Sequence, residues 1–239
     1  MKLLLTSAGI KNPSIYQTLL ELLGKPVSEA NALCIPTAMY GHPWVGPGTK
    51  AWDFISGNEP RTPMAELGWK SVGVLELSAL PSLPKDLWMP KVRQADVLLV
   101  AGGDAAYLAH WMHLSGMMTL LPELDETVWV GLSAGSMVMA PRVGDDFVGW
   151  TNPLLGESAP RNDTTLGLVD FGIFPHLDHP DLPNNKLENA KRWAAAMEIP
   201  CYLIDDETAI SVVDGKVDVV SEGSWIQIPC TGSFIECKD

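Results

Sequence analysis

Ser133 has the setting in this chain that is best suited to covalent chemistry. It lies at the centre of Gly131-Leu132-Ser133-Ala134-Gly135, after a β-branched and aromatic run at 128–130 and before an apolar, helix-forming segment at 136–140. In a strand–turn–helix of this kind the serine hydroxyl projects from the end of the sheet, and the helix start directs free N–H groups at negative charge that forms beside it. The pattern therefore predicts a nucleophile that attacks a carbonyl carbon; the alternative is a serine that only caps a helix.

A serine hydroxyl needs a base to remove its proton, and candidates follow two later strand-like runs. His176 comes after the run 168–174, and Asp205-Asp206-Glu207 comes after the run 202–204. Histidine has a reference pKa of about 6.5, and a carboxylate behind its ring fixes the tautomer and stabilises the imidazolium. Since sites form at the carboxyl ends of strands in open parallel sheets, we expect Ser133, His176 and one of the three acids to meet at one edge.

A fourth strand-like run, 96–101, ends in Gly102-Gly103-Asp104 and leads into a helix-like segment. A glycine N–H here, together with the N–H of Ala134, would form an oxyanion hole, and losing one such donor typically costs about 2.7–4 kcal/mol of transition-state stabilisation. A tight strand-to-helix turn that binds nothing would have the same sequence, and the two interpretations are compatible.

These motifs resemble the peptidase E (aspartyl dipeptidase) family of serine peptidases, with cyanophycinase as a more distant relative. The resemblance is carried by Gly-Leu-Ser133-Ala-Gly-Ser, Ala101-Gly-Gly-Asp, Pro175-His176 and Ile204-Asp-Asp206-Glu-Thr-Ala, and it extends from the first strand to the hairpin near the C-terminus. It implies the fold of class I glutamine amidotransferases, with serine in place of their cysteine.

The resemblance also implies roles for single residues. Ser133 would be the nucleophile and His176 the base, with Gly103 and Ala134 donating to the oxyanion. Asp206 falls at the family's position for the third member of the triad. Two neighbouring carboxylates remain alternatives for that role: Asp205 and Glu207. The order serine, histidine, acid differs from that of α/β-hydrolases, in which the acid precedes the histidine.

The segment after His176 departs from the family in a way that affects specificity. Family members that cut after an N-terminal aspartate hold the substrate carboxylate with a basic residue there, whereas residues 177–189 contain Lys186 as their only lysine or arginine. Other cations could serve instead: Arg142, Arg161, Lys191 and Arg192. The expected activity is therefore hydrolysis of small peptides through an acyl-enzyme, without metal or cofactor, and aspartate specificity stays open. The alternatives are an esterase or amidase, and a non-catalytic small-molecule-binding domain of the same fold.

Composition bounds the class of protein. The chain has 239 residues, 46% of them hydrophobic and 19% charged, which indicates a globular protein with a sizeable core, and we expect one α/β domain over residues 1–239. The net charge of −13 argues against nucleic acid and anionic membranes as partners. A homodimer is possible, but the sequence locates no interface.

The chain start and the cysteines favour the cytoplasm. Residues 1–6 are too short for the apolar region of a signal peptide, and no stretch approaches the ~20 apolar residues of a membrane span. The four cysteines have no metal-ligand spacing, and because no export signal is evident we expect their thiols to be reduced. His110 and His113 lie three residues apart, as do His176 and His179, and histidine pairs with this spacing can bind zinc. The sequence places no third zinc ligand beside either pair, so core or surface histidines are expected.

Strand-like and helix-like runs alternate through the chain, which is typical of a parallel sheet covered by helices. The expected strands are 2–6, 32–35, 72–77, 96–101, 127–130, 168–174 and 202–204, and the expected helices are 13–23, 85–94, 105–113 and 185–197. Asp214-Gly215 predicts a hairpin between 209–213 and 216–220. The fold class is therefore α/β, with a mostly parallel central sheet flanked by helices on both faces and a C-terminal β-hairpin region. Three tryptophans are candidate pocket walls: Trp44, Trp52 and Trp150.

Overall fold

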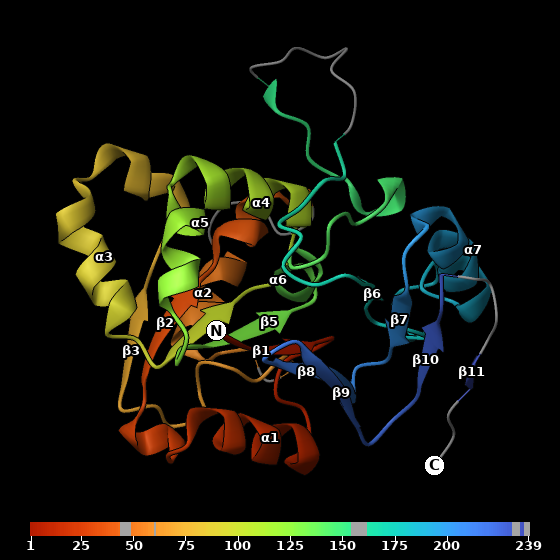
Figure 1. Cartoon of the computed structure of the whole chain (residues 1–239), viewed down its shortest axis with the longest axis horizontal. Coiled ribbons are helices and arrows are strands. Elements are labelled where there is room, and N and C mark those ends of the chain that lie inside the picture. The colour runs from red at the N-terminus through yellow and green to blue at the C-terminus, as the bar shows by residue number, and fades with distance from the viewer. Residues whose placement is uncertain (44–48, 60, 154–161, 231–234, 237–239) are drawn as a thin grey trace.

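A mostly parallel sheet forms the centre of the molecule. The computed structural model describes residues 1–43, 49–59, 61–153, 162–230 and 235–236. Within them, seven strands form one sheet in the order β3-β2-β4-β5-β1-β8-β9. These strands are β1 (Lys2–Thr6), β2 (Asn31–Ile35), β3 (Ser71–Val74), β4 (Val97–Val100), β5 (Val128–Leu132), β8 (Thr208–Val213) and β9 (Lys216–Ser221). The first five strands in that order are parallel, and β8 and β9 are added as antiparallel strands (Figure 1).

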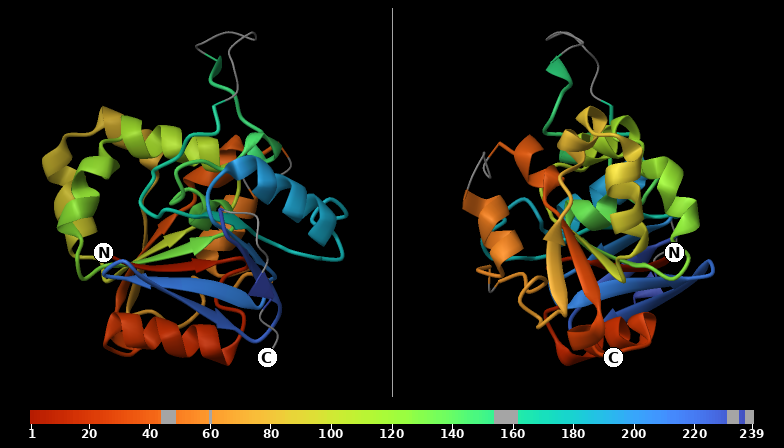
Figure 2. Two further views of the ribbon diagram at one scale, coloured as in Figure 1. Left: turned by 45° about the vertical axis from the view of Figure 1, so that its right-hand side comes forward. Right: turned by 90° about the vertical axis from the view of Figure 1, so that its left-hand side faces the viewer.

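Helices cover both faces of this sheet, as the sequence predicts. The helices of the described residues are α1 (Pro13–Leu23), α2 (Thr49–Ser56), α3 (Lys85–Arg93), α4 (Ala105–Leu114), α5 (Met117–Leu120), α6 (Ala134–Met137) and α7 (Leu187–Met197), and all but α7 pack against the two faces of this sheet. Alternate side chains of the strands enter two separate cores. Leu98 and Trp129 pack with α3, α4 and α5, whereas Leu99 and Val130 pack with α1 and α2 on the other face. Figures 1 and 2 show these two groups of helices on opposite sides of the sheet. Short 3₁₀ turns complete the layers: Val27–Glu29, Thr37–Gly41, Leu77–Ser82, Leu121–Glu123 and Asp145–Phe147.

The local signals in the sequence are confirmed where they are strongest. The predicted helix 13–23 is α1, which starts at an Asn12 cap and ends at Gly24 in the left-handed region. The Asp214-Gly215 hairpin joins β8 to β9, with φ values of 51° and 77° at its two central residues. The predicted strands 72–77 and 168–174 are longer than the strands that form.

A second, smaller sheet changes the expected placement of the catalytic candidates. It has the order β11-β10-β7-β6 within the described residues, and α7 packs against it. Its strands are β6 (Gly172–Phe174), β7 (Cys201–Ile204), β10 (Trp225–Ile228) and β11 (Ile235–Glu236). His176 and the acids at 205–207 therefore follow strands of the small sheet, whereas Ser133 follows β5 of the central sheet. The expectation that all three lie at the edge of one sheet is wrong in this respect.

The chain crosses between the two sheets at the acidic residues. Residues 205–207 connect β7 of the small sheet to β8 of the central sheet, and β8 pairs with β1. In the central sheet, Thr6 is opposite Leu132, so Ser7 and Ser133 leave two adjacent parallel strands at the same level. The carboxyl ends of β1 and β5 and the link at 205–207 thus meet where the two sheets join.

Candidate active site

The backbone at Ser133 is held in an unusual conformation by its neighbours. Its φ of 49° and ψ of −110° lie where residues with a side chain are strained. The Ser133 N–H donates to the carbonyl of Thr6 at 3.1 Å, which ties the turn to β1. A Cβ at Gly131 would lie 2.4 Å from the Gly135 carbonyl oxygen, so the first glycine of the motif is required for the turn to close. The half-buried side chain of Ser133 is thereby fixed at the end of β5.

The helix after Ser133 is shorter than the sequence suggested. α6 is a single turn of four residues, so the macrodipole that it can offer is small. The N–H groups at the start of α6 can still donate hydrogen bonds to a negative charge, whatever the length of the helix. Among the described residues, no protein acceptor is bound by the N–H of Ala134 or by that of Gly103. Both donors predicted for the oxyanion hole are therefore free.

The Gly102-Gly103 turn lies directly beside Ser133. A Cβ built on Gly102 would be 3.4 Å from the Cβ of Ser133. Gly103 has a φ of 138°, and a Cβ there would lie 2.3 Å from the Ala38 carbonyl oxygen, so no larger residue fits. The next residue, Asp104, donates its N–H to the same carbonyl at 2.9 Å. The Gly102-Gly103 turn is thus closely packed between Ser133 on one side and the 3₁₀ turn that contains Ala38 on the other.

His176 and Asp206 form a close pair at the ends of β6 and β7. The distance from His176 Nδ1 to Asp206 Oδ1 is 2.6 Å, and both side chains are about one-fifth exposed. Leu177 N–H donates to the carbonyl of Ile204 at 3.0 Å, which joins the two loops next to the pair. Asp206 Oδ2 lies 3.5 Å from Nε2 of His179, a second histidine on the same carboxylate.

The electrostatics fix the tautomer of His176. Burial acts to raise the pKa of Asp206, but the hydrogen bond and charge of His176, a hydrogen bond from Ser7 and the charge of His179 outweigh it and lower that pKa below the usual 3.8. Asp206 is therefore a carboxylate at neutral pH, which only accepts hydrogen bonds. The proton of neutral His176 consequently lies on Nδ1, and Nε2 is the basic atom.

The two alternative acids have other partners. Asp205 accepts from the Thr208 hydroxyl at 2.7 Å and from the N–H groups of Glu207 and Ser224, so it stabilises the link between the sheets. Glu207 accepts from Nδ2 of Asn12 at 3.1 Å. Of the three candidates left open by the sequence, Asp206 is the one that contacts a histidine ring.

The Ser133 hydroxyl and the His176 ring share no hydrogen bond in this structure. They are connected instead through the end of β1. Thr6 accepts the N–H of Ser133, and the next residue, Ser7, accepts the N–H of His176 at 2.7 Å through its hydroxyl. Sequence reasoning missed Ser7, because a serine at the end of a first strand carries no signal that distinguishes it from other serines.

The buried thiols of Cys34 and Cys201 are poor nucleophiles. Burial, with a smaller contribution from Glu66, raises the pKa of Cys34 to about 12, and burial raises that of Cys201 to about 12 as well. Within the described part of the chain, no three His, Cys, Asp or Glu side chains are grouped so that they could hold a metal ion.

Two of the cations considered for substrate binding, Lys186 and Arg142, are engaged with acids. Lys186 Nζ lies 3.6 Å from Asp178, and Arg142 pairs with Asp163 at 2.7 Å. Arg192 donates to Asn189, and Arg161 lies outside the described residues. The structure adds a cation that the sequence did not suggest, since Arg61 lies 3.9 Å from Asp181 in the loop after His176.

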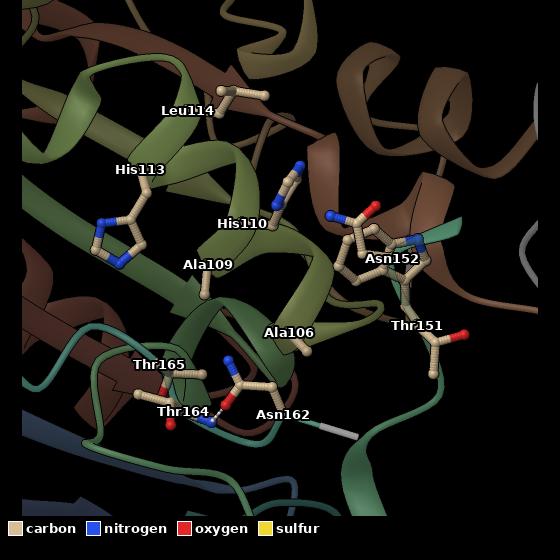
Figure 3. A pocket seen from close by; sticks show the side chains of 11 residues that line it. Ala106, Ala109, His110, His113, Leu114, Thr151, Asn152, Asn162, Thr164 and Thr165 are labelled. Atoms are coloured by element: carbon tan, nitrogen blue, oxygen red, sulfur yellow. Dashed lines mark hydrogen bonds between the residues drawn. The ribbon is translucent and has the colours of Figure 1, made fainter. Parts of the chain in front are cut away.

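A cavity of about 520 Å³ lies along α4, beyond the Gly-Gly turn. Figure 3 shows His110 and His113 on α4, with Thr151 and Asn152 on one side and Asn162, Thr164 and Thr165 on the other. Trp150 also lines it, which confirms one of the three candidate walls. Trp52 is 65% exposed on α2 and does not line this cavity, and Trp44 lies outside the described residues.

Asp104 connects this cavity to the turn beside Ser133. The side chain is buried, and its Oδ1 accepts from Tyr107 N–H at the start of α4. Its Oδ2 accepts from the N–H groups of Gly149 and Trp150 at 3.0 and 2.7 Å. One carboxylate therefore holds both the first turn of α4 and the backbone of the cavity wall.

With this geometry in view, comparisons with known proteins give the family. The model of peptidase family S51 matches residues 3–220. The chain belongs to peptidase family S51. The resemblance to peptidase E that the motifs indicate is thereby confirmed.

Individual relatives of this S51 peptidase are distant. The "Uncharacterized peptidase PM1590" of Pasteurella multocida (strain Pm70) is 30% identical over 88 residues, which span 36% of this chain and 42% of that relative. A crystal structure of a Listeria monocytogenes EGD-e protein named for peptidase E has a TM-score of 0.66 at 18% identity, covering 93% of this chain and 98% of that one. A peptidase from an acI-B1 Actinobacterium has a TM-score of 0.61 at 19% identity, covering 99% and 96%. These two structures support the fold.

Among the described residues, no helix combines the length and the apolar character needed to cross a lipid bilayer.

Proposed function

We propose that this S51 peptidase is a serine-type hydrolase that cleaves small peptides through an acyl-enzyme, with Ser133 as nucleophile, His176 as base and Asp206 as the acid of a triad. The observation that carries the proposal is the 2.6 Å pair of His176 and Asp206, joined to the strained Ser133 turn by two consecutive residues, Thr6 and Ser7. Dipeptide-sized substrates are favoured by the resemblance of the motifs to peptidase E.

The first half of the reaction forms the acyl-enzyme. Ser133 Oγ attacks the carbonyl carbon of the scissile bond while its proton passes to His176 Nε2, and Asp206 stabilises the resulting imidazolium. The negative charge on the carbonyl oxygen is stabilised by the free N–H groups of Gly103 and Ala134. The intermediate then collapses, the C–N bond breaks, and His176 returns the proton to the leaving amine.

The second half regenerates the enzyme. A water molecule gives a proton to His176 Nε2 and attacks the acyl carbon, and the Ser133 oxygen leaves and takes that proton back. The missing hydrogen bond between Ser133 and His176 is compatible with this sequence of steps, because such bonds are often long without substrate and tighten when it binds.

The test compares peptides with esters and labels the serine. Wild type is incubated with a panel of dipeptides and tripeptides, with short-chain esters, and with a fluorophosphonate probe followed by mass spectrometry. We expect peptide hydrolysis and a label on Ser133, and both should be lost in Ser133→Ala with the fold intact. Ser82→Ala, which changes an exposed serine in a 3₁₀ turn, is the control. Peptide hydrolysis by Ser133→Ala would refute the mechanism, and turnover of esters alone would replace the peptidase by an esterase.

A further inference from the structure

Ser7 is the fully buried residue that follows β1, and its hydroxyl contacts both members of the proposed His–Asp pair. It accepts the backbone N–H of His176 at 2.7 Å and donates to Asp206 Oδ1 at 3.0 Å. It also lies 3.4 Å from His176 Nδ1. The Ser7 N–H donates to the carbonyl of Thr208 at the start of β8, so its backbone is fixed as well.

The bonding capacity of a hydroxyl determines its orientation here. A serine hydroxyl has one proton and two lone pairs. Asp206 is a carboxylate and can only accept, so the Ser7 proton points at Asp206, while a lone pair receives the His176 N–H. The proton on His176 Nδ1 is directed at the nearer Asp206 oxygen, at 2.6 Å. Each polar hydrogen between these three residues thus has one defined acceptor.

The bond to His176 N–H acts where the backbone is strained. His176 has a φ of 56°, in the left-handed region that favours glycine. Such a conformation costs of order 1–3 kcal/mol and persists where the surroundings determine it. The Ser7 hydroxyl is a buried group that holds the main chain at this point, and the direction of the imidazole follows from that main chain.

Ser7 also relates this pair to the nucleophile. It lies beside Ser133, because Thr6 pairs with Leu132 in the parallel register of β1 and β5. The carbonyl of Thr6 accepts the N–H of Ser133, and the side chain of the next residue binds His176 and Asp206. A displacement of Ser7 would therefore move the pair relative to the serine across the junction of the two sheets.

We infer that Ser7 is a positioning residue: its hydroxyl sets the His176 backbone and the Asp206 carboxylate in one arrangement and aligns both with Ser133. This inference rests on the proposed function for its effect on rate. It assigns Ser7 no contact with the substrate and no transfer of a proton in the reaction.

The rate experiment is a double-mutant cycle. Wild type, Ser7→Ala, Asp206→Asn and the double variant are compared by kcat and KM on the best peptide and by the rate of Ser133 labelling. We expect Ser7→Ala to lower kcat and the labelling rate by ~10-fold or more with KM changed less than ~3-fold, and to have an effect below ~3-fold once Asp206 is already Asn. Ser115→Ala is the control, since Ser115 is also buried and hydrogen-bonded, but at the corner between α4 and α5.

The outcomes separate this inference from the proposed function. If wild type is active and Ser7→Ala behaves like Ser115→Ala, or if its effect is as large with Asn at 206 as with Asp, the inference is overturned and the proposed function stands. If wild type is inactive, the proposed function fails. In that case the NMR signal of the His176 Nδ1 proton, which is measured without catalytic turnover, tests the positioning role of Ser7. A signal that shifts or exchanges faster in Ser7→Ala supports the inference, and an unchanged signal overturns it.

A second variant covers the case in which Ser7→Ala does not fold. Ser7→Cys keeps the size of the side chain but replaces the hydroxyl by a weak donor and acceptor. It should show the same decrease in kcat at constant KM and the same change in the His176 signal, each to a smaller extent. Wild-type values for both in a folded Ser7→Cys protein would overturn the inference.

Discussion

The Nδ1 atom of His176 lies 2.6 Å from Oδ1 of Asp206 at the ends of two parallel strands in the small sheet. Ser133, by contrast, ends a strand of the central sheet. The candidate site is therefore assembled across a junction: one sheet supplies the proposed nucleophile, and the other supplies the proposed base with its acid. The link at 205–207 joins the two sheets covalently, and Ser7, directly after β1, joins them through hydrogen bonds.

The first prediction decides among the three acids. Asp206→Asn should lower kcat by ~10²–10⁴-fold with little change in KM, because an amide behind His176 favours the wrong tautomer and does not stabilise the imidazolium. Glu207→Gln, whose side chain contacts Asn12 in the wild type, is the matched control and should keep kcat within ~3-fold. Steady-state kinetics on one peptide suffice. A loss in Glu207→Gln that equals the loss in Asp206→Asn would contradict the assignment.

The second prediction concerns stability in acid. The pKa of Asp206 is lower in the folded chain than its ordinary 3.8, so the unfolded state takes up its proton first as the pH falls. The stabilisation from this group is therefore complete above the ordinary value and is lost as the pH falls through the lower, folded value. The free energy of unfolding in urea should differ between wild type and Asp206→Asn at pH 6, and the difference should shrink below pH ~3.8.

Asp96 provides the comparison for this experiment. Burial acts to raise its pKa as well, but hydrogen bonds from Lys25 and Asn31 outweigh this and lower it. The difference in unfolding free energy between wild type and Asp96→Asn should likewise shrink below pH ~3.8, while kcat stays near that of wild type. An Asp206 contribution that is constant from pH 6 to pH 2.5 would be inconsistent with a lowered pKa.

Much of the fold follows from local patterns, and the exceptions have physical reasons. Asn12, Pro13 and Gly24 define α1 through capping chemistry, and the apolar runs of β4 and β5 identify central parallel strands. These signals act over a few residues. The division into two sheets depends instead on which strands become neighbours, for example β7 with β10, and this pairing of distant segments leaves no local mark.

The candidate site was predictable to a similar extent. Ser133, His176 and Asp206 each follow a strand-like run, so their types and positions could be recognised. Ser7 and His179 act through contacts with Asp206 made by the tertiary fold, and a serine or histidine in a loop has no pattern that announces such a contact. The choice among Asp205, Asp206 and Glu207 likewise depends on side-chain directions over three consecutive residues.

The third prediction separates the two histidines on Asp206. His179 Nδ1 accepts the N–H of Asp181 at 3.1 Å, so its proton lies on Nε2, which faces Asp206 Oδ2 at the longer distance of 3.5 Å. His179 therefore has no free basic nitrogen. We expect His179→Gln to reduce kcat by less than ~10-fold and His176→Gln to reduce it by at least ~10³-fold. The reverse order of effects would make His179 the base.

The fourth prediction tests whether the cavity along α4 takes part in substrate binding. In Asp104→Asn the Oδ1 cap of α4 can persist, but one side-chain NH₂ group then faces the N–H groups of Gly149 and Trp150. Leaving buried donors without an acceptor costs about 1–3 kcal/mol, so the backbone that carries Trp150 should move away from α4. Because the change affects a cavity wall and leaves the His176–Asp206 pair in place, KM should rise by more than kcat falls.

The control for Asp104→Asn is Thr151→Val, which alters another lining residue without touching the Asp104 bonds. Kinetics with a short and a longer peptide extend the test, since a longer peptide reaches further from Ser133 along α4. A larger rise in KM for the longer peptide is expected if the cavity holds its distal part. An unchanged KM for both peptides in folded Asp104→Asn would show that the cavity along α4 does not take part in binding these peptides.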